Sequence, residues 1–400
     1  MKTLEIGNAK LSRGNEISEL SVVVRWGAYS GREIAFRTSH SLVSSSCDPF
    51  VPAVLLPAMQ RKLDIEIRGA VSENLLRAAE RVEQVLAAWH PDWHPSRLSA
   101  KEQDHGDKPA VPGTQVGLFF SGGVDSFYTL LKHRAEITHL IFVAGFDIPL
   151  RHTALRQSIT AEMRRTAEAI GLPLLEVETS LRSFSDGLSF PWEEQFGAAM
   201  AGVAHFLAPT FGRIYIPSGY ALPFLVPHGS HPGLDPLWSS TSLELVHDGI
   251  EATRFDKIGA LCASDVAVRN LRVCWQLKEG QYNCCRCRKC MWTMAFLRAH
   301  GALDRARTFS VPLDLRKLGE SHFRYPEERY RFIQAIGKLE QRGDDHALAN
   351  AMRAALRRRA SFLNRLRRSL KQLRRRTVAR LRNVVRAARQ FASTYRAPTS

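Results

Sequence analysis

Ser121-Gly122-Gly123-Val124-Asp125-Ser126 lies between an apolar segment at residues 116–120 and a helix-like segment at residues 127–132. The apolar segment predicts a buried strand, so the chain passes here from a strand through a glycine loop into a helix. Two glycines allow the backbone to approach an anion closely, and the start of a helix offers free N–H groups and the positive end of its dipole. The serines add hydroxyl donors. The loop therefore fits a pyrophosphate group.

Beyond the loop, short apolar strands alternate with helical segments. Strands are predicted at residues 139–143, 174–177 and 213–216, and helices at residues 154–170 and 192–207. This alternation predicts an α/β fold built on a doubly wound parallel sheet. In such sheets ligands bind beyond the carboxyl ends of the strands, which is where the glycine loop would lie.

Upstream of the loop, residues 1–100 have the pattern of a small α/β domain. Strand composition recurs in this segment, and apolar residues follow at helical spacing from Ser72, as N-cap, to Trp89. Residues 101–113 are polar, with two prolines and two glycines, and predict a linker. The predicted organisation is a domain at 1–100, a linker at 101–113, a second domain at 114–325, a helical segment at 326–352 and a tail at 353–400.

The formal net charge of +17 is concentrated in the tail. Residues 353–400 contain 16 Lys or Arg and no Asp or Glu, which leaves +1 for residues 1–352. Leucines recur among these arginines at helical steps, which predicts a basic amphipathic helix. Three partners fit such a helix: RNA or DNA, an anionic membrane surface, and the groove of a partner protein. A solvated helix that packs on the body is the alternative.

Five of the seven cysteines lie between residues 274 and 290. The spacing of Cys274, Cys284, Cys287 and Cys290 predicts a tetrahedral Zn²⁺ site, and four protein ligands make it structural because no position is left for water. Cys285 could replace a neighbour or remain a free thiol. The clustering suits a reducing compartment, and the sequence shows neither a signal-peptide pattern nor an apolar run of about 18 residues, so we expect a cytoplasmic location.

The glycine loop resembles the SGGxDS signature of the PP-loop, or N-type ATP pyrophosphatase, superfamily, and it matches every specified position. Its spacing differs from that of the Walker loop and of the dinucleotide-binding fingerprint. The resemblance implies an adenine nucleotide alpha hydrolase-like fold that binds ATP, with Asp125 positioning Mg²⁺. The implied cofactor-binding residues of the loop are Ser121, Gly122, Gly123, Val124, Asp125 and Ser126. The alternative is a plain strand-to-helix turn.

Two weaker matches and one unusual loop complete the set of candidate residues. Gly219 ends a predicted strand and would line the pocket, and Lys257 lies in a segment that resembles the superfamily's phosphate-facing lysine segment. A solvated lysine is the alternative for Lys257. A loop rich in histidine could line a substrate pocket or supply a general base, or could simply structure a Pro/Gly turn. Its candidate residues are His228, His231, Asp235, His247 and Asp248.

The glycine loop and the cysteine knuckle together resemble the 7-cyano-7-deazaguanine synthase family of the queuosine pathway, over about residues 115–300. That resemblance implies adenylation of a carboxylate, followed by attack of ammonia. The chain departs from the family in its N-terminal domain, its basic tail, its histidine-rich loop, and Cys285, where the family usually has glycine. These departures indicate a divergent branch.

We therefore expect an ATP-dependent ligase-type enzyme that uses ATP, Mg²⁺ and Zn²⁺. It would adenylate the carboxylate of a small molecule or of a partner protein, release pyrophosphate, and direct ammonia or an amine to the product. The alternative is a PP-loop RNA-modifying enzyme such as a tRNA sulfurtransferase, with the tail as RNA anchor and the cysteines as sulfur carriers or iron–sulfur ligands. A nucleotide-binding scaffold without catalysis is the third possibility.

Overall fold

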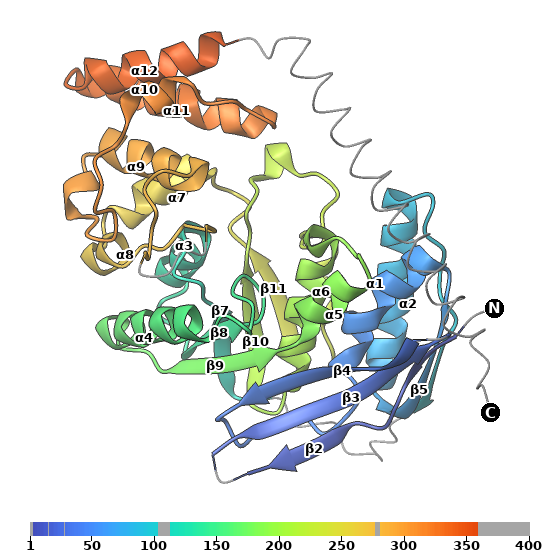
Figure 1. Ribbon diagram of the computed structural model, residues 1–400. Coiled ribbons are helices and arrows are strands. Elements are labelled where there is room, and N and C mark those ends of the chain that lie inside the picture. Colours follow the sequence, from blue (N-terminus) through green and yellow to red (C-terminus); the bar gives the residue numbers. More distant parts are fainter. Residues whose placement is uncertain (1–2, 15, 28, 103–112, 277–280, 359–400) are drawn as a thin grey trace, which may run out of the picture.

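The computed structural model describes residues 3–14, 16–27, 29–102, 113–276 and 281–358 (Figure 1). Its centre is one 11-stranded sheet in the order β11-β10-β7-β8-β9-β4-β3-β1-β5-β6, with β2 paired to β3. Both the predicted first domain and the predicted second domain contribute strands to this sheet. The architecture is α/β, as the alternation of strands and helices predicts.

Five parallel strands form what we call the parallel half of the sheet. They are β7 (Gln115–Phe119), β8 (His139–Ala144), β9 (Leu174–Thr179), β10 (Phe211–Pro217) and β11 (Glu244–Asp248). The chain adds β8 and β9 on one side of β7, and then crosses to add β10 and β11 on the other side. The direction of winding reverses between β7 and β10. Such a switch point is where open α/β sheets bind ligands.

The remaining strands form the N-terminal half. They are β1 (Thr3–Ile6), β2 (Lys10–Arg13), β3 (Ser18–Trp26), β4 (Tyr29–Thr38), β5 (Asp64–Val71) and β6 (Leu98–Glu102). The two halves are joined by an antiparallel pairing of β4 with β9, in which Phe36 lies opposite Thr179. The sheet thus continues from one predicted domain into the other, and most of the predicted linker, residues 103–112, lies outside the described residues.

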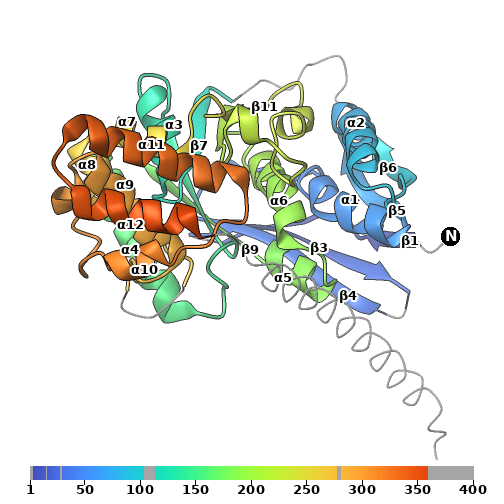
Figure 2. The same cartoon turned by 90° about the horizontal axis from the view of Figure 1, so that it is seen from above.

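Helices cover both faces of the sheet (Figures 1 and 2). One face carries α1 (Phe50–Arg61), α2 (Glu73–Trp89), α5 (Leu181–Gly187) and α6 (Trp192–Phe206). The other carries α3 (Val124–Lys132), α4 (Thr153–Ile170), α7 (Arg254–Leu261) and α9 (Arg288–Ala299). Successive strand residues enter opposite cores, because side chains alternate along a strand: Leu118 packs in the second core and Phe119 in the first. This two-sided burial confirms the doubly wound fold.

Four further helices extend the second core beside α9. They are α8 (Asp265–Arg269), α10 (Leu315–Gly319), α11 (Pro326–Arg342) and α12 (His346–Arg357). Met352 and Ala355 of α12 are fully buried, so the start of the predicted tail belongs to the folded body. Residues 359–400, which hold most of the predicted tail, lie outside the described residues. No helix in the described residues is both long and apolar enough to cross a membrane.

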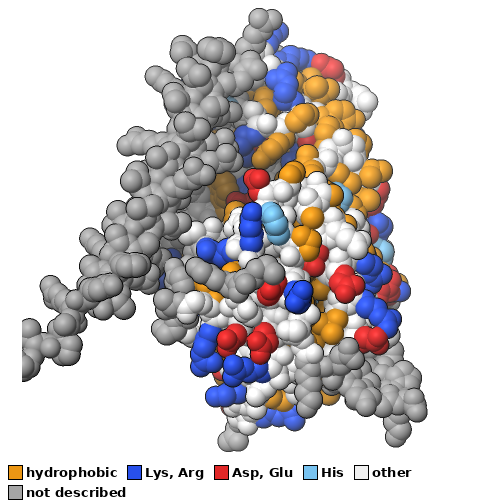
Figure 3. Space-filling view, turned by 90° about the vertical axis from the view of Figure 1, so that its right-hand side faces the viewer, with side chains coloured by type: hydrophobic (Ala, Val, Ile, Leu, Met, Phe, Trp, Pro, Cys, Tyr) orange, Lys and Arg blue, Asp and Glu red, His pale blue; other side chains and the backbone are white. Residues whose placement is uncertain are grey.

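On the face that lies to the right in Figure 1, the described side chains do not form a large patch of one charge (Figure 3). Acidic and basic side chains lie side by side over its lower part, and hydrophobic side chains gather over its upper part (Figure 3). This mixture agrees with the net charge of only +1 that remains once the tail is set aside.

Candidate functional site

The glycine loop leaves β7 and enters α3 at the switch point, with Gly123 as N-cap. Gly122 has a φ of +69°, in the left-handed region that favours glycine, and an added Cβ would lie 3.0 Å from Met163 Cε. The Ser126 hydroxyl donates a hydrogen bond of 3.1 Å to the Gly123 carbonyl oxygen and accepts one of 3.4 Å from the Ser121 N–H. The loop is therefore held in a fixed, tight turn before any ligand binds.

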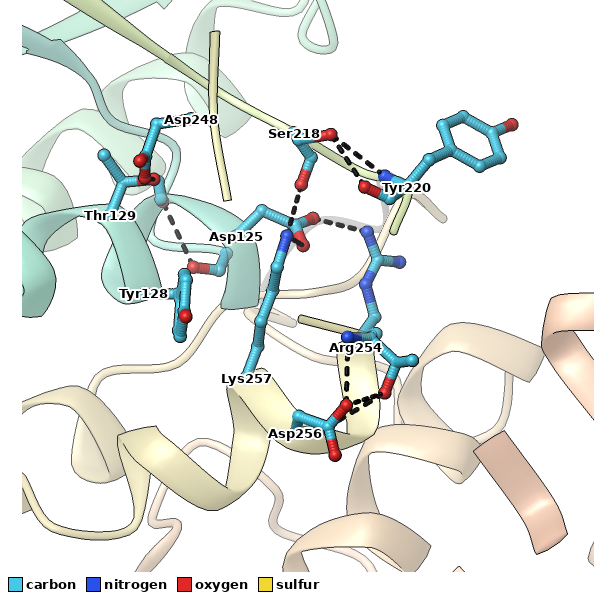
Figure 4. A network of polar contacts seen from close by, with 12 residues as sticks. Asp125, Tyr128, Thr129, Ser218, Tyr220, Asp248, Arg254, Asp256 and Lys257 are labelled. Atoms are coloured by element: carbon cyan, nitrogen blue, oxygen red, sulfur yellow. Dashed lines mark hydrogen bonds and ion pairs between the residues drawn. The ribbon is translucent and has the colours of Figure 1, made fainter. Parts of the chain in front are cut away.

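Asp125, in the first turn of α3, meets two basic residues of α7 (Figure 4). Arg254 forms an ion pair with one carboxylate oxygen, and Lys257 Nζ lies 3.4 Å from the other. Lys257 also donates a hydrogen bond of 2.7 Å to the Ser218 carbonyl oxygen at the end of β10. Helix α7 starts in a capping box formed by Thr253 and Asp256, which fixes where Arg254 and Lys257 project.

Lys257 is buried, with a side-chain exposure of 1%, so it is not a solvated surface lysine. Burial lowers the pKa of Lys257, and the nearby carboxylate of Asp125 opposes that shift only in part. For Asp125 burial favours the neutral acid, but Arg254 and Lys257 outweigh it and hold the pKa below its usual value. Asp125 is therefore ionised near neutral pH, with 21% of its side chain exposed.

Two adjoining cavities open at the carboxyl edge of the parallel half. The first, of about 320 Å³, we call the apolar cavity, because Phe142, Phe146, Phe196 and Met200 contribute to its walls. The second, of about 250 Å³, we call the cationic cavity. Both are lined by Ser121, Gly123, Asp125, Asp147, Arg272 and Lys289. The loop thus forms part of the wall between an apolar space and a charged one.

Five basic side chains line the cationic cavity: Arg254, Arg272, Arg288, Lys289 and Arg331. Three of them are paired, Arg254 with Asp125, Arg288 with Glu328 at 3.1 Å, and Arg331 with Glu327 at 2.5 Å. Within the described residues, Arg272 and Lys289 form no ion pair with an acidic group. A cavity with this surplus of positive charge suits an anionic ligand.

Arg272 was not predicted as a site residue. It is 7% exposed, its Nε has no hydrogen-bond partner among the described residues, and its backbone N–H donates a hydrogen bond of 2.7 Å to the Gly122 carbonyl oxygen. A buried guanidinium without a partner is costly, so its place against the glycine loop points to an anion at this position. The signal in the sequence is slight: Arg272 lies two residues before Cys274.

The four predicted ligand cysteines converge. The Sγ atoms of Cys274, Cys284, Cys287 and Cys290 all lie within 4.8 Å of one another and could hold one metal ion. The N–H groups of Cys287 and Cys290 donate to Cys284 Sγ at 3.3 Å and to Cys287 Sγ at 3.4 Å, as suits thiolates that carry negative charge. Cys285 is not part of the cluster. Its φ of +55° lies in the left-handed region that favours glycine.

The histidine-rich loop separates into two groups. His228 lines the apolar cavity, together with Ser230 and the predicted pocket residue Gly219. The other candidates line neither cavity. Asp235 is fully buried and accepts hydrogen bonds of 2.7 Å from Ser230 and from His247 Nδ1, and His231 Nδ1 accepts one of 2.9 Å from the Gly233 N–H.

Asp248, at the end of β11, binds residues of α3. It accepts a hydrogen bond of 2.8 Å from Thr129, which lies beside it in Figure 4. It also accepts one of 2.7 Å from Lys132 and lies 3.0 Å from His133 Nε2. Its own carbonyl oxygen accepts a hydrogen bond of 2.7 Å from the Ser218 N–H. Asp248 therefore fixes the backbone of Ser218, whose carbonyl oxygen binds Lys257.

Ser121, Gly123, Val124, Asp125, Ser126 and Gly219 line one or both cavities, whereas Lys257 contacts Asp125 but lines neither. The cysteine cluster adjoins the cationic cavity through Cys274. No protein-family model, curated protein or solved structure matches the chain. The chemistry of the two cavities and of the cysteine cluster therefore carries the functional inference.

Proposed function

We propose that this chain is an ATP-dependent ligase-type enzyme of the PP-loop superfamily, which adenylates a carboxylate and releases pyrophosphate. The observation that carries the proposal is the buried Lys257 beside Asp125 at a glycine loop that opens on the cationic cavity. Polyphosphate binding needs several positive groups and N–H donors in one place. The fixed loop supplies N–H donors without reorganisation, and the basic residues of the cationic cavity supply the charge.

In this proposal the phosphate chain lies toward Arg254, Arg272 and Lys289, and the adenine ring enters the apolar cavity. ATP would attract Lys257 and Arg254 toward its phosphates and leave Asp125 free to bind a cation. Mg²⁺ would neutralise phosphate charge and is commonly bound by one or two carboxylates together with phosphate oxygens. Asp125 and Asp147 both line the two cavities and fit that role.

The proposed reaction has two steps. A substrate carboxylate oxygen attacks the α-phosphorus, and the bond to the bridging oxygen breaks to release pyrophosphate. Ammonia or an amine then attacks the acyl carbon, loses a proton, and expels AMP. The fixed cations around Asp125 would stabilise the negative charge that develops on pyrophosphate in the first step.

The cysteine cluster supports a structural Zn²⁺ rather than a second reaction centre. Four cysteine sulfurs within 4.8 Å of one another can supply all four ligands of a tetrahedral ion, which would leave no open position for water or for sulfur transfer. Colourless protein with one equivalent of zinc is expected, whereas a brown iron–sulfur protein would favour the RNA-modifying alternative.

Product analysis tests the proposal directly. The protein is incubated with ATP, Mg²⁺ and pools of small carboxylic acids with ammonium, and the nucleotide products are separated. AMP and pyrophosphate in equal amounts are expected, together with exchange of labelled pyrophosphate into ATP. Accumulation of ADP would refute the proposal, because a kinase-type reaction cleaves a different bond.

A further inference from the structure

His228 and Ser230, two residues apart in the chain, both line the apolar cavity. The Ser230 N–H donates a hydrogen bond of 3.3 Å to His228 Nδ1. Nδ1 is therefore the acceptor of the ring, so in the neutral imidazole Nε2 carries the proton. The edge that His228 can offer to a ligand is a donor.

Ser230 offers the opposite character. Its hydroxyl donates a hydrogen bond of 2.7 Å to Asp235 Oδ2. Asp235 Oδ2 also lies 2.7 Å from His247 Nδ1. Asp235 is fully buried, and the side chain of His247 is 2% exposed. Because the hydroxyl proton is donated to Asp235, Ser230 Oγ has only lone pairs left for a further partner. Ser230 is an acceptor.

The loop that carries the pair is packed tightly on α6. A Cβ at Gly197 would lie 2.0 Å from the Gly229 carbonyl oxygen and 2.6 Å from Asp235 Oδ1, and a Cβ at Gly229 would lie 2.2 Å from the Glu194 carbonyl oxygen. Backbones this close cannot separate without loss of packing. Helix α6 also supplies Phe196 and Met200 to the cavity, so the polar pair and the apolar walls belong to one rigid unit.

We propose that His228 and Ser230 form a recognition pair for a planar ring whose edge carries an acceptor next to a donor. Flat apolar walls favour a ring, and a fixed donor–acceptor pair rejects rings that lack the matching edge, because the buried polar groups would then be left unpaired. Two ligands of the proposed function have such an edge: the adenine of ATP, with N1 beside its 6-amino group, and a substrate ring with a lactam edge. The proposal rests on the proposed function only for the choice of these probes.

Calorimetric titration with two matched pairs of ligands shows whether His228 and Ser230 recognise adenine or a substrate ring. The first pair is ATP and purine riboside 5′-triphosphate, which lacks the 6-amino group. The second is 2-oxo-1,2-dihydroquinoline-4-carboxylate and quinoline-4-carboxylate, which lacks the lactam edge. Each is titrated into the full chain as wild type, as Ser230→Ala and as the control Ser242→Ala. Ser242 lies in the same region but outside the cavity lining.

We expect the wild type and Ser242→Ala to bind the donor-bearing member of one pair about tenfold more tightly, and Ser230→Ala to lose that preference. Preference in the first pair assigns the recognised edge to adenine, and preference in the second assigns it to the substrate. His228→Phe, which keeps a ring but no donor, should weaken binding of both members of the first pair about equally, because both keep the N1 acceptor. A wild type without preference in either pair, including one that binds neither member, overturns the proposal, as does a preference that survives in Ser230→Ala. Since the titration measures binding alone, a wild type with the preference but no AMP formation would refute only the proposed function.

Discussion

Both halves of the sheet contain parallel strands, yet among the described residues only the parallel half lines the apolar and cationic cavities. In the parallel half, β7, β8 and β10 reach one edge at their carboxyl ends, and residues that follow them line both cavities. Among the described residues of the N-terminal half, none lines either cavity. Parallel strands place consecutive loops at a common edge, whereas the antiparallel pairs β3–β4 and β1–β3 place theirs at opposite edges. Strands β1, β5 and β6 of the N-terminal half are parallel as well. Strand direction alone therefore does not make the difference, which lies in the glycine loop after β7 and in the basic residues that line the cavities.

The variants with the largest expected difference compare enzymatic activity after substitution of one lysine in each half. Lys257→Met removes the buried ammonium beside Asp125, and we expect AMP formation to fall about 100- to 1,000-fold, the range for loss of one preorganised donor. Lys10→Met, in exposed strand β2 of the N-terminal half, is the matched control and should retain full activity. Steady-state rates of both variants provide the measurement. Equal losses would mean that the comparison between the halves is wrong.

Cysteine substitutions come next in size. Cys287→Ser leaves three thiolates in the cluster, and we expect the free energy of unfolding to fall by about 3 to 5 kcal/mol, with loss of bound zinc. Cys47→Ser, at a buried thiol of the N-terminal half, should keep one equivalent of zinc. Elemental analysis and denaturant unfolding report the two quantities. Less than half an equivalent of zinc in the wild type, with no other metal in its place, would contradict the metal assignment.

Arg272→Ala tests the residue that sequence patterns did not identify. Removal of an unpaired guanidinium at the loop should weaken binding of ATP about 10- to 100-fold, or about 1.4 to 2.8 kcal/mol, and should reduce the dependence of binding on salt. Arg68→Ala, at an exposed arginine paired with Glu5 in the N-terminal half, is the control and should bind normally. If Arg272→Ala binds ATP as well as the control does, the cationic cavity is not the phosphate site.

Glu83 of α2 provides a test of pH dependence in the half without a site. Burial raises its pKa from 4.5 to about 7, although the Ser96 N–H donates a hydrogen bond of 2.8 Å to its carboxyl group. The folded state then holds a proton that the unfolded state has lost, so stability decreases as pH rises from 4.5 to about 7 and is level above that. Glu83→Gln should match the wild type near pH 4 and exceed it by about 1 to 3 kcal/mol at pH 8. Urea unfolding at the two pH values measures this, and a constant difference would show that Glu83 has an ordinary pKa.

The smallest expected effect concerns the tail, which belongs to neither half. Removal of residues 359–400 should leave ATP affinity and melting temperature unchanged, while salt-sensitive binding to RNA or to anionic vesicles is lost. The cut must follow Arg358, because a chain that ended near Ala351 would lose the buried Met352 and Ala355. Filter binding to tRNA and sedimentation with acidic liposomes compare the two partners. Loss of ATP binding in the shortened chain would assign the tail to the fold.

Local patterns predicted the elements that depend on neighbouring residues. The glycine loop, the helix at Glu73–Trp89 and the convergence of four cysteines each follow from spacing within a short segment. Helix α1 shows the limit of such patterns. Its sequence holds Pro57 in the helix interior, where proline normally ends or kinks a helix, but ten residues of α1 are buried and that packing outweighs the local cost.

Long-range contacts could not be predicted in the same way. Arg272 meets Gly122 from 150 positions away, and Arg254 meets Asp125 from 129 positions away, with no spacing rule that connects them. The placement of the residues of the histidine-rich loop also depends on long-range contacts. Whether a histidine there lines the cavity or binds Asp235 depends on how η2 (Asp235–Trp238) packs, and a single sequence does not encode that packing in any local pattern.

The pairing of β4 with β9 also sets the order in which the chain can be completed during translation. Residues 36–38 leave the ribosome long before their partners at 177–179. At ordinary elongation rates the delay is on the order of ten seconds, far longer than strand pairing itself needs. During that interval the edge of β4 has unsatisfied N–H and C=O groups and is open to pairing with other nascent chains. Because the β4–β9 pairing joins the two halves, we expect the nascent chain to need chaperones until β9 has been synthesised. Fragments that end before residue 174 should therefore aggregate.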